Sequence, residues 1–199
     1  MRMTRIGPTG TTIYPDDTDS MGEAIGFYAE QAKALQEGGV DAICIETMVS
    51  REETEAALGA VKNHTKLPVV VSAVFSAKDP AIHTLWGMDL PTFVKCAQDF
   101  GANVIGGNCI ESWPEAVKIA EALRSATKLP IIIQPNAGLP RIVDGKPIYT
   151  PNDEVMLESA ERLLKIGVNI LGGCCGTTPN DIAKLRRVVD RFNQVNKPR

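Results

Sequence analysis

The sequence lacks the features that mark several large classes of protein. None of its uninterrupted apolar stretches approaches the roughly 20 residues that a helix needs to cross a bilayer. The formal net charge of −3 comes without a run of like charges, so nothing indicates binding to a nucleic-acid backbone or an anionic membrane. The first six residues lead into Gly-Pro-Thr-Gly instead of the apolar core of a signal peptide, so we expect a cytoplasmic protein.

Several common catalytic arrangements are missing as well. The two histidines, His64 and His83, do not end any of the strands predicted below, so we expect surface positions for them and no Ser-His or Cys-His catalysis. No Gly-x-Gly-x-x-Gly pattern follows a strand, which argues against a dinucleotide-like site for S-adenosylmethionine. No lysine ends a predicted strand, which disfavours a barrel aldolase or lyase.

What is present fits one globular domain over residues 1–199. The chain is 44% hydrophobic and 23% charged, and its near balance of charge suits a small neutral or zwitterionic ligand. Its 5 cysteines are an odd number, and in an intracellular chain cysteines are more often ligands, nucleophiles or small core residues than disulfides.

An internal repeat predicts the fold. Segments 39–43, 101–105 and 167–171 each join a glycine to a short apolar run, and segments 65–71 and 127–133 share Thr-Lys-Leu-Pro before an apolar run. Both kinds recur at an offset of 62 residues, from 39 to 101 and from 65 to 127. Short apolar runs bounded by Gly or Pro are typical of parallel strands buried on both faces.

Helix-start patterns lie between these strands. Ser-x-x-Glu begins at residues 20, 50 and 112, and Thr-Pro begins at 150 and 178. An average of about 31 residues per strand-helix unit is that of an eight-unit (β/α)8 TIM barrel, although an open doubly wound sheet has similar units. The chain holds about six units, so we expect the C-terminal part of a barrel that lacks its first two βα units.

Three cysteines lie where such folds bind ligands, at the C-terminal ends of strands. Cys109 ends one strand, and Cys174 with Cys175 ends the strand two units later, each within a Gly-rich turn. Three thiols without an evident fourth ligand suit a zinc ion with one open position, whereas structural zinc sites close with four protein ligands. A vicinal disulfide or redox pair at Cys174 and Cys175 is a minority alternative that leaves Cys109 unexplained.

Other residues receive different predictions. Cys44 and Cys96, inside a strand and a helix, are expected to be buried core residues. Glu46, at the end of a strand, can hold an ammonium group. Asn136 offers an amide donor and acceptor at the same C-terminal end of the strands. The alternative for Glu46 is a solvated strand end.

Gly-Gly-Asn-Cys at 106–109, followed by Gly-Gly-Cys-Cys-Gly-Thr-Thr-Pro at 172–179, resembles the zinc motifs of the homocysteine S-methyltransferase family. Segments 6–10, 45–47 and 135–140 are especially similar to the homocysteine domain of cobalamin-dependent methionine synthase. The resemblance implies a (β/α)8 barrel in which Cys109, Cys174 and Cys175 bind zinc, and Glu46 and Asn136 hold the substrate amino group. The family's first-strand Asp-Gly-x-x-Gly-Thr motif has no counterpart.

These features predict methyl transfer to the thiol of homocysteine, giving methionine. Zinc would deprotonate the substrate thiol, and the donor is expected to be a methylated corrinoid, methylcobalamin, on a partner domain or protein. Alternatives are a betaine or S-methylmethionine donor, and a zinc- or thiol-binding module without turnover. Two absent units would leave strand edges unpaired, so we also expect self-association, a complementing N-terminal polypeptide or local rearrangement.

Overall fold

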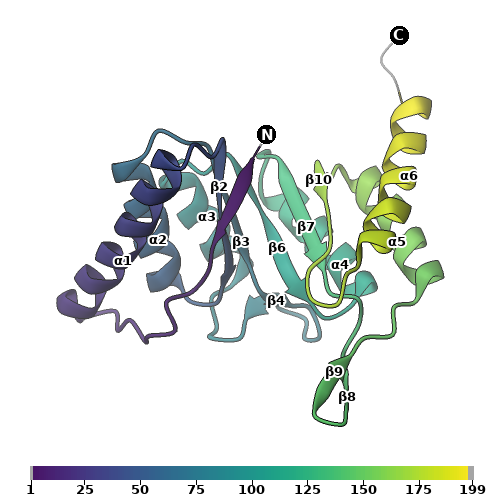
Figure 1. Ribbon diagram of the computed structural model, residues 1–199, viewed down its shortest axis with the longest axis horizontal. Helices are drawn as coiled ribbons and strands as arrows, with labels where there is room; N and C mark the ends of the chain where they lie inside the picture. The colour runs from purple at the N-terminus through teal and green to yellow at the C-terminus, as the bar shows by residue number, and fades with distance from the viewer. Residues whose placement is uncertain (1, 197–199) are drawn as a thin grey trace.

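Six parallel strands form the centre of the fold, which a computed structural model describes over residues 2–196 (Figure 1). They follow one another across the sheet in the order of the chain. Five helices, with two short hairpins in the loops, separate them, and a sixth helix follows the last strand. The strands are β1 (Met3–Ile6), β2 (Ala42–Met48), β3 (Val69–Ala73), β6 (Val104–Ile110), β7 (Ile131–Pro135) and β10 (Ile170–Leu171). The helices are α1 (Thr18–Glu37), α2 (Arg51–His64), α3 (Leu90–Asp99), α4 (Trp113–Ala126), α5 (Asp153–Ile166) and α6 (Pro179–Val195).

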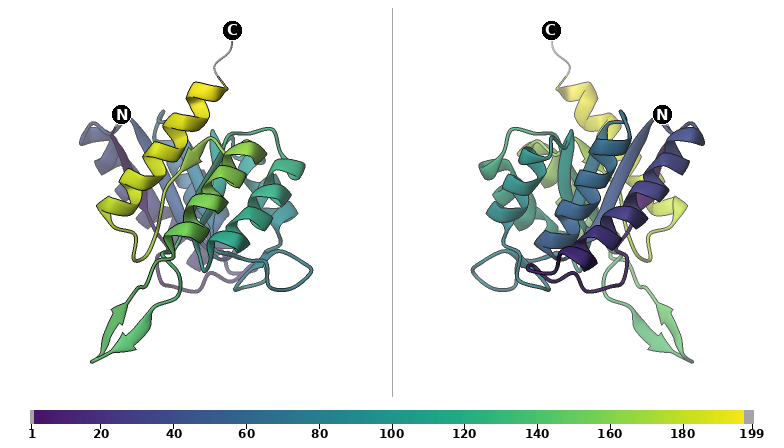
Figure 2. Two further views of the ribbon diagram at one scale, coloured as in Figure 1. Left: turned by 90° about the vertical axis from the view of Figure 1, so that its right-hand side faces the viewer. Right: turned by 90° about the vertical axis from the view of Figure 1, so that its left-hand side faces the viewer.

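The strand order decides between the two architectures that unit length left open. A doubly wound sheet reverses its strand order at a switch point and carries helices on both faces. Here the order β1-β2-β3-β6-β7-β10 never reverses, and the helices cover the outer side of a curled sheet (Figures 1 and 2). The predicted barrel-type fold is therefore confirmed as a part-barrel, with β1 and β10 as edges of the sheet over the described residues.

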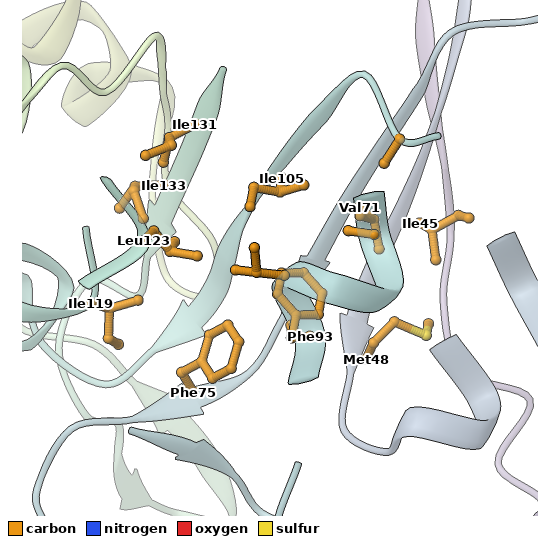
Figure 3. Packing of buried hydrophobic residues seen from close by; sticks show 14 of the residues in the cluster. Ile45, Met48, Val71, Phe75, Phe93, Ile105, Ile119, Leu123, Ile131 and Ile133 are labelled. Carbon is orange, nitrogen blue, oxygen red and sulfur yellow. The ribbon is translucent and has the colours of Figure 1, made fainter. Parts of the chain in front are cut away.

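The two faces of the sheet bury different side chains. Ile45, Val71 and Ile105 point toward the helices and belong to a large core that also holds Phe75 and Phe93, whose ring centroids lie 5.3 Å apart (Figure 3). The concave face buries a smaller cluster of Cys44, Val70 and Ile132. Alternate residues of a strand point to opposite faces, so residues 44 and 45 belong to different clusters.

Three of the five predicted helix starts are correct. Ser50, Ser112 and Thr178 cap α2, α4 and α6. The predictions at residues 20 and 150 are wrong, because Asp17 and Asn152 accept the capping hydrogen bonds of α1 and α5. Asp and Asn are as good N-caps as Ser, so the pattern alone could not choose between neighbours.

Two buried glutamates brace loops instead of closing capping boxes. Glu53 accepts hydrogen bonds from the backbone N–H and hydroxyl of Thr9 and from the hydroxyl of Tyr28. Glu115, at the matching place 62 residues later, accepts from the backbone N–H of Ala77 at 2.7 Å. Each of these strand-to-helix loops is therefore held by the first turn of the helix in the next strand-helix unit, α2 for the loop after β1 and α4 for the loop after β3.

Two antiparallel hairpins extend the loops that follow strands. The first pairs β4 (Phe75–Ser76) with β5 (His83–Thr84), and the second pairs β8 (Arg141–Val143) with β9 (Lys146–Ile148). The β8-β9 hairpin projects away from the rest of the molecule (Figure 2). Within residues 2–196, no helix combines the length and apolar character needed to cross a bilayer.

Candidate metal centre

The three predicted thiols meet at one end of the sheet. Cys109 lies at the end of β6, while Cys174 and Cys175 lie in the turn that follows β10. We call them the rim cysteines. Their sulfur atoms all lie within 4.8 Å of one another. Among the described residues, they form the one cluster of His, Cys, Asp or Glu side chains close enough together to hold a metal ion. The separation between Cys109 Sγ and Cys174 Sγ is 2.9 Å, and that between Cys109 Sγ and Cys175 Sγ is 4.0 Å.

The separation between Cys109 and Cys175 suits two ligands of one tetrahedral ion, and the cysteines form no disulfide. A disulfide needs sulfur atoms about 2.05 Å apart, and none of the rim cysteines is bonded in this way. Three sulfurs at about 2.3 Å from one zinc lie roughly 3.8 Å apart, close to the observed 4.0 Å separation. The closer Cys109–Cys174 pair shares a hydrogen bond, which raises the pKa of Cys109 and lowers the pKa of Cys174.

Backbone geometry at the strand ends aims the thiols at a common point. Cys109 has a φ of 53°, which residues other than glycine seldom adopt. Gly176, directly after Cys174 and Cys175, has a φ of 78°. At Gly106 a Cβ atom would lie 1.8 Å from the carbonyl oxygen of Ile132. The glycines of the motifs are therefore required both by conformation and by close contact between β6 and β7.

Asn108, directly beside Cys109, joins several strands through its side-chain hydrogen bonds, and this role could not be read from the sequence beyond the residue's place in the motif. Its side chain is fully buried. Its Oδ1 accepts from the N–H of Thr47 at 2.9 Å and the hydroxyl of Ser72 at 2.7 Å. Its Nδ2 donates to Thr47 Oγ1 at 2.8 Å and makes a longer contact of 3.9 Å with Cys174 Sγ. The amide thereby joins β2, β3 and β6 to the rim.

Asn136 lies between the two cysteine segments. Its Nδ2 donates to the carbonyl oxygen of Cys109 at 3.3 Å, and its Oδ1 accepts from the N–H of Cys175 at 3.1 Å. The side chain thus ties the end of β6 to the turn after β10. One N–H of the amide and one lone pair of its oxygen remain beyond these two contacts.

Glu46 lies at the end of β2 near the rim cysteines. Its side chain is 15% exposed, and its Oε1 lies 3.4 Å from Arg5 Nη1. Burial raises the pKa of Glu46, with a smaller contribution from Cys174, while the charge of Arg5 opposes the rise. The carboxylate is therefore partly desolvated.

Tyr149 is a neighbour of the rim that the sequence interpretation missed. It follows β9, and its ring lies so close to Gly176 that a Cβ atom there would be 2.2 Å from Tyr149 Cγ. Burial and the nearby Cys175 raise the pKa of the tyrosine hydroxyl. The base of the β8-β9 hairpin therefore packs directly on the turn that carries the cysteine pair.

The remaining predicted positions lie apart from this cluster. Cys44 and Cys96 are buried, as predicted, and burial raises the pKa of each thiol to about 12. His64 is exposed, as expected, and His83 is half-buried; the ring of each contacts a backbone carbonyl oxygen. Neither histidine joins the metal-type cluster formed by the described residues.

Comparison with known proteins explains the arrangement. A sequence model of the family described as Homocysteine S-methyltransferase matches residues 3–189. The chain belongs to the homocysteine S-methyltransferase family. A methionine synthase of Mycobacterium leprae (strain TN) is 29% identical over 178 residues, which are 86% of this chain and 14% of that protein.

Solved structures of the homocysteine methyltransferase MmuM from Escherichia coli share the fold. The apo form superposes with a TM-score of 0.75 at 22% identity, covering 94% of this chain and 61% of that one. The metallated form gives a TM-score of 0.72 at 23% identity, covering 92% and 59%. The chain thus spans less than two thirds of the length of these relatives.

Proposed function

We propose that this homocysteine S-methyltransferase family member binds zinc through the rim cysteines and presents the thiol of homocysteine for methylation, giving methionine. The observation that carries the proposal is the convergence of three thiols, from two separate strand ends, within 4.8 Å. Three thiolates on a zinc ion leave its fourth position for a substrate sulfur. The membership of the family supports homocysteine as that substrate.

The chemistry divides between the ion and the side chains. Bound zinc would hold the substrate sulfur as a thiolate at neutral pH, where a free thiol of pKa about 8.5 is mostly protonated. Asn108 and Asn136 hold the cysteine segments in place through hydrogen bonds to Cys174 and to the backbone of Cys109 and Cys175. In the transfer, the bond from the methyl carbon to its donor breaks, and a carbon–sulfur bond forms.

Glu46 is proposed to bind the substrate ammonium group. Its partly desolvated carboxylate lies close enough to Cys174 for that thiol to affect its pKa. Asn136 is proposed as a second contact to the substrate amino group through the remaining N–H and lone pair of its amide. Both roles place the amino acid with its thiol toward the rim cysteines.

The methyl donor is proposed to be a methylated corrinoid on a partner domain or protein. The likeness to a methionine synthase supports this choice over a betaine or S-methylmethionine donor. We also infer that further strands pair with the free edges of β1 and β10, supplied by the same polypeptide, a second copy or another chain. Light scattering of the purified chain measures whether it self-associates, as it should if a second copy supplies these strands.

The test combines metal content with turnover. Wild-type protein should carry about one zinc per chain, and Cys109→Ala, Cys174→Ala and Cys175→Ala should each lose most of it. The matched control is Cys96→Ala, which removes a buried thiol from α3 and should keep the metal. Homocysteine methylation with methylcobalamin should follow zinc content across this series. Full zinc occupancy in the Cys109→Ala protein would refute the ligand assignment.

A further inference from the structure

Arg5 is a charged residue near the proposed site for which the function above gives no role. It lies on β1, an edge strand, in register with Cys44 of β2. Its neighbour Ile6 is in register with Ile45 and is buried against the helices. Because in-register side chains of parallel strands point to the same face, Arg5 lies on the concave face with Cys44.

The contacts of Arg5 leave most of its guanidinium group available. Over the described residues, its hydrogen bonds and ion pairs consist of the single 3.4 Å contact with Glu46, and its side chain is 68% exposed. A guanidinium carries five N–H donors and binds carboxylates through two of them at once. A carboxylate that binds on the concave face near Glu46 could therefore accept hydrogen bonds from the N–H groups of Arg5 that Glu46 does not use.

The pairing also changes what Glu46 can bind. A carboxylate that already faces a guanidinium is partly neutralised, so a simple amine must compete with Arg5 for it. A zwitterion brings one charge of each sign and can match both members of the pair. Its ammonium group would face Glu46, and its carboxylate would face Arg5.

We propose that Arg5 binds the carboxylate of the substrate amino acid while Glu46 binds its ammonium group, so that this site selects a zwitterionic thiol. The inference rests on the proposed function, because the substrate thiol must reach the rim cysteines. Arg5 and Glu46 are 41 residues apart in the chain and come together through the register of β1 on β2. The selectivity is thus built into the pairing of two strands.

Three thiols with the same carbon spacing test the proposal. L-homocysteine carries both charged groups, 4-mercaptobutyrate only the carboxylate, and 3-aminopropane-1-thiol only the amine. Each is titrated into cobalt-loaded protein, where sulfur binding changes the thiolate-to-metal absorption without any methyl transfer. Arg5→Ala should weaken homocysteine and 4-mercaptobutyrate by about ten- to a hundredfold, the range for a charge-assisted hydrogen bond, and should leave 3-aminopropane-1-thiol equal or stronger.

Matched variants separate this role from a general effect. Glu46→Gln should give the mirror pattern, with loss for the amine and none for 4-mercaptobutyrate. Arg5→Lys, which keeps the charge, should recover part of the carboxylate affinity. Arg51→Ala is the control, since Arg51 is similarly exposed at 61% and also pairs with a glutamate, but lies on α2. It should change none of the three affinities.

The outcomes are distinct. Unchanged 4-mercaptobutyrate affinity in Arg5→Ala, or an equal loss for all three thiols, overturns the role of Arg5 while leaving the proposed function intact. If none of the thiols changes the spectrum of cobalt-loaded wild-type protein, the proposed function itself fails, and the inference fails with it.

Discussion

Replacing Asn108 by alanine should destabilise the fold through the hydrogen bonds of its buried amide. The change leaves the N–H of Thr47 and the hydroxyl of Ser72 without their acceptor, and Ser72 is itself fully buried. An unsatisfied buried donor costs about 1–3 kcal/mol, so two of them predict a loss of roughly 2–6 kcal/mol in the free energy of unfolding. Thr47 also has a φ of 67°, which its bond to Asn108 helps to hold.

Urea denaturation of metal-free, reduced protein measures this loss without a contribution from zinc binding. Asn108→Asp is the informative comparison, because its carboxylate keeps the acceptor for Thr47 and Ser72 and loses the donor to Thr47 Oγ1. It should cost less than the alanine variant at neutral pH. Ser72→Ala removes one hydrogen bond of Asn108 and should cost about 1 kcal/mol. An Asn108→Ala protein within about 0.5 kcal/mol of wild type would show that the side chain of Asn108 does not stabilise the strand ends.

Three further predictions concern other parts of the molecule. In metal-free protein near neutral pH, a thiol reagent should quickly modify Cys174, whose pKa is lowered, and the exposed Cys175. It should modify Cys44 and Cys96 only on unfolding, since both are buried and burial raises their pKa values to about 12; five equally fast thiols would contradict this. Gly106→Ala should prevent folding or lower the thermal midpoint steeply, because its Cβ would lie 1.8 Å from a carbonyl oxygen, whereas Gly26→Ala, in open space on α1, should stabilise by roughly 0.5–1 kcal/mol. The capping bonds of α6 lower the pKa of Asp181 below 3.8. Its ionised form therefore stabilises the fold above pH 3.8, and this stabilisation is lost as the pH falls through the lowered pKa. Asp181→Asn should thus destabilise the protein near pH 7 and much less near about pH 2; equal shifts of the urea midpoint at both pH values would refute the assignment.

The strands and the candidate metal site could be predicted from the sequence because they are recorded in short local patterns. Apolar runs bounded by Gly or Pro, repeated at an offset of 62 residues, located five of the six strands of the sheet, all except β1. The rule that ligands bind at the C-terminal ends of parallel strands then indicated that Cys109, Cys174 and Cys175 would lie together. Neither inference required knowledge of which side chains touch across the sheet.

The contacts around the thiols could not be predicted in the same way, because they depend on register and on which face each side chain occupies. Arg5 meets Glu46 only through the pairing of β1 with β2, and Asn108 meets Thr47 across 61 residues of chain. Tyr149 reaches Gly176 because the base of the β8-β9 hairpin packs on the cysteine turn. A shift of one residue in any of these strands would send the side chains to the opposite face. The sequence by itself therefore determined the repeat and the three cysteines that lie together, and only the tertiary structure decided which charged and amide groups surround them.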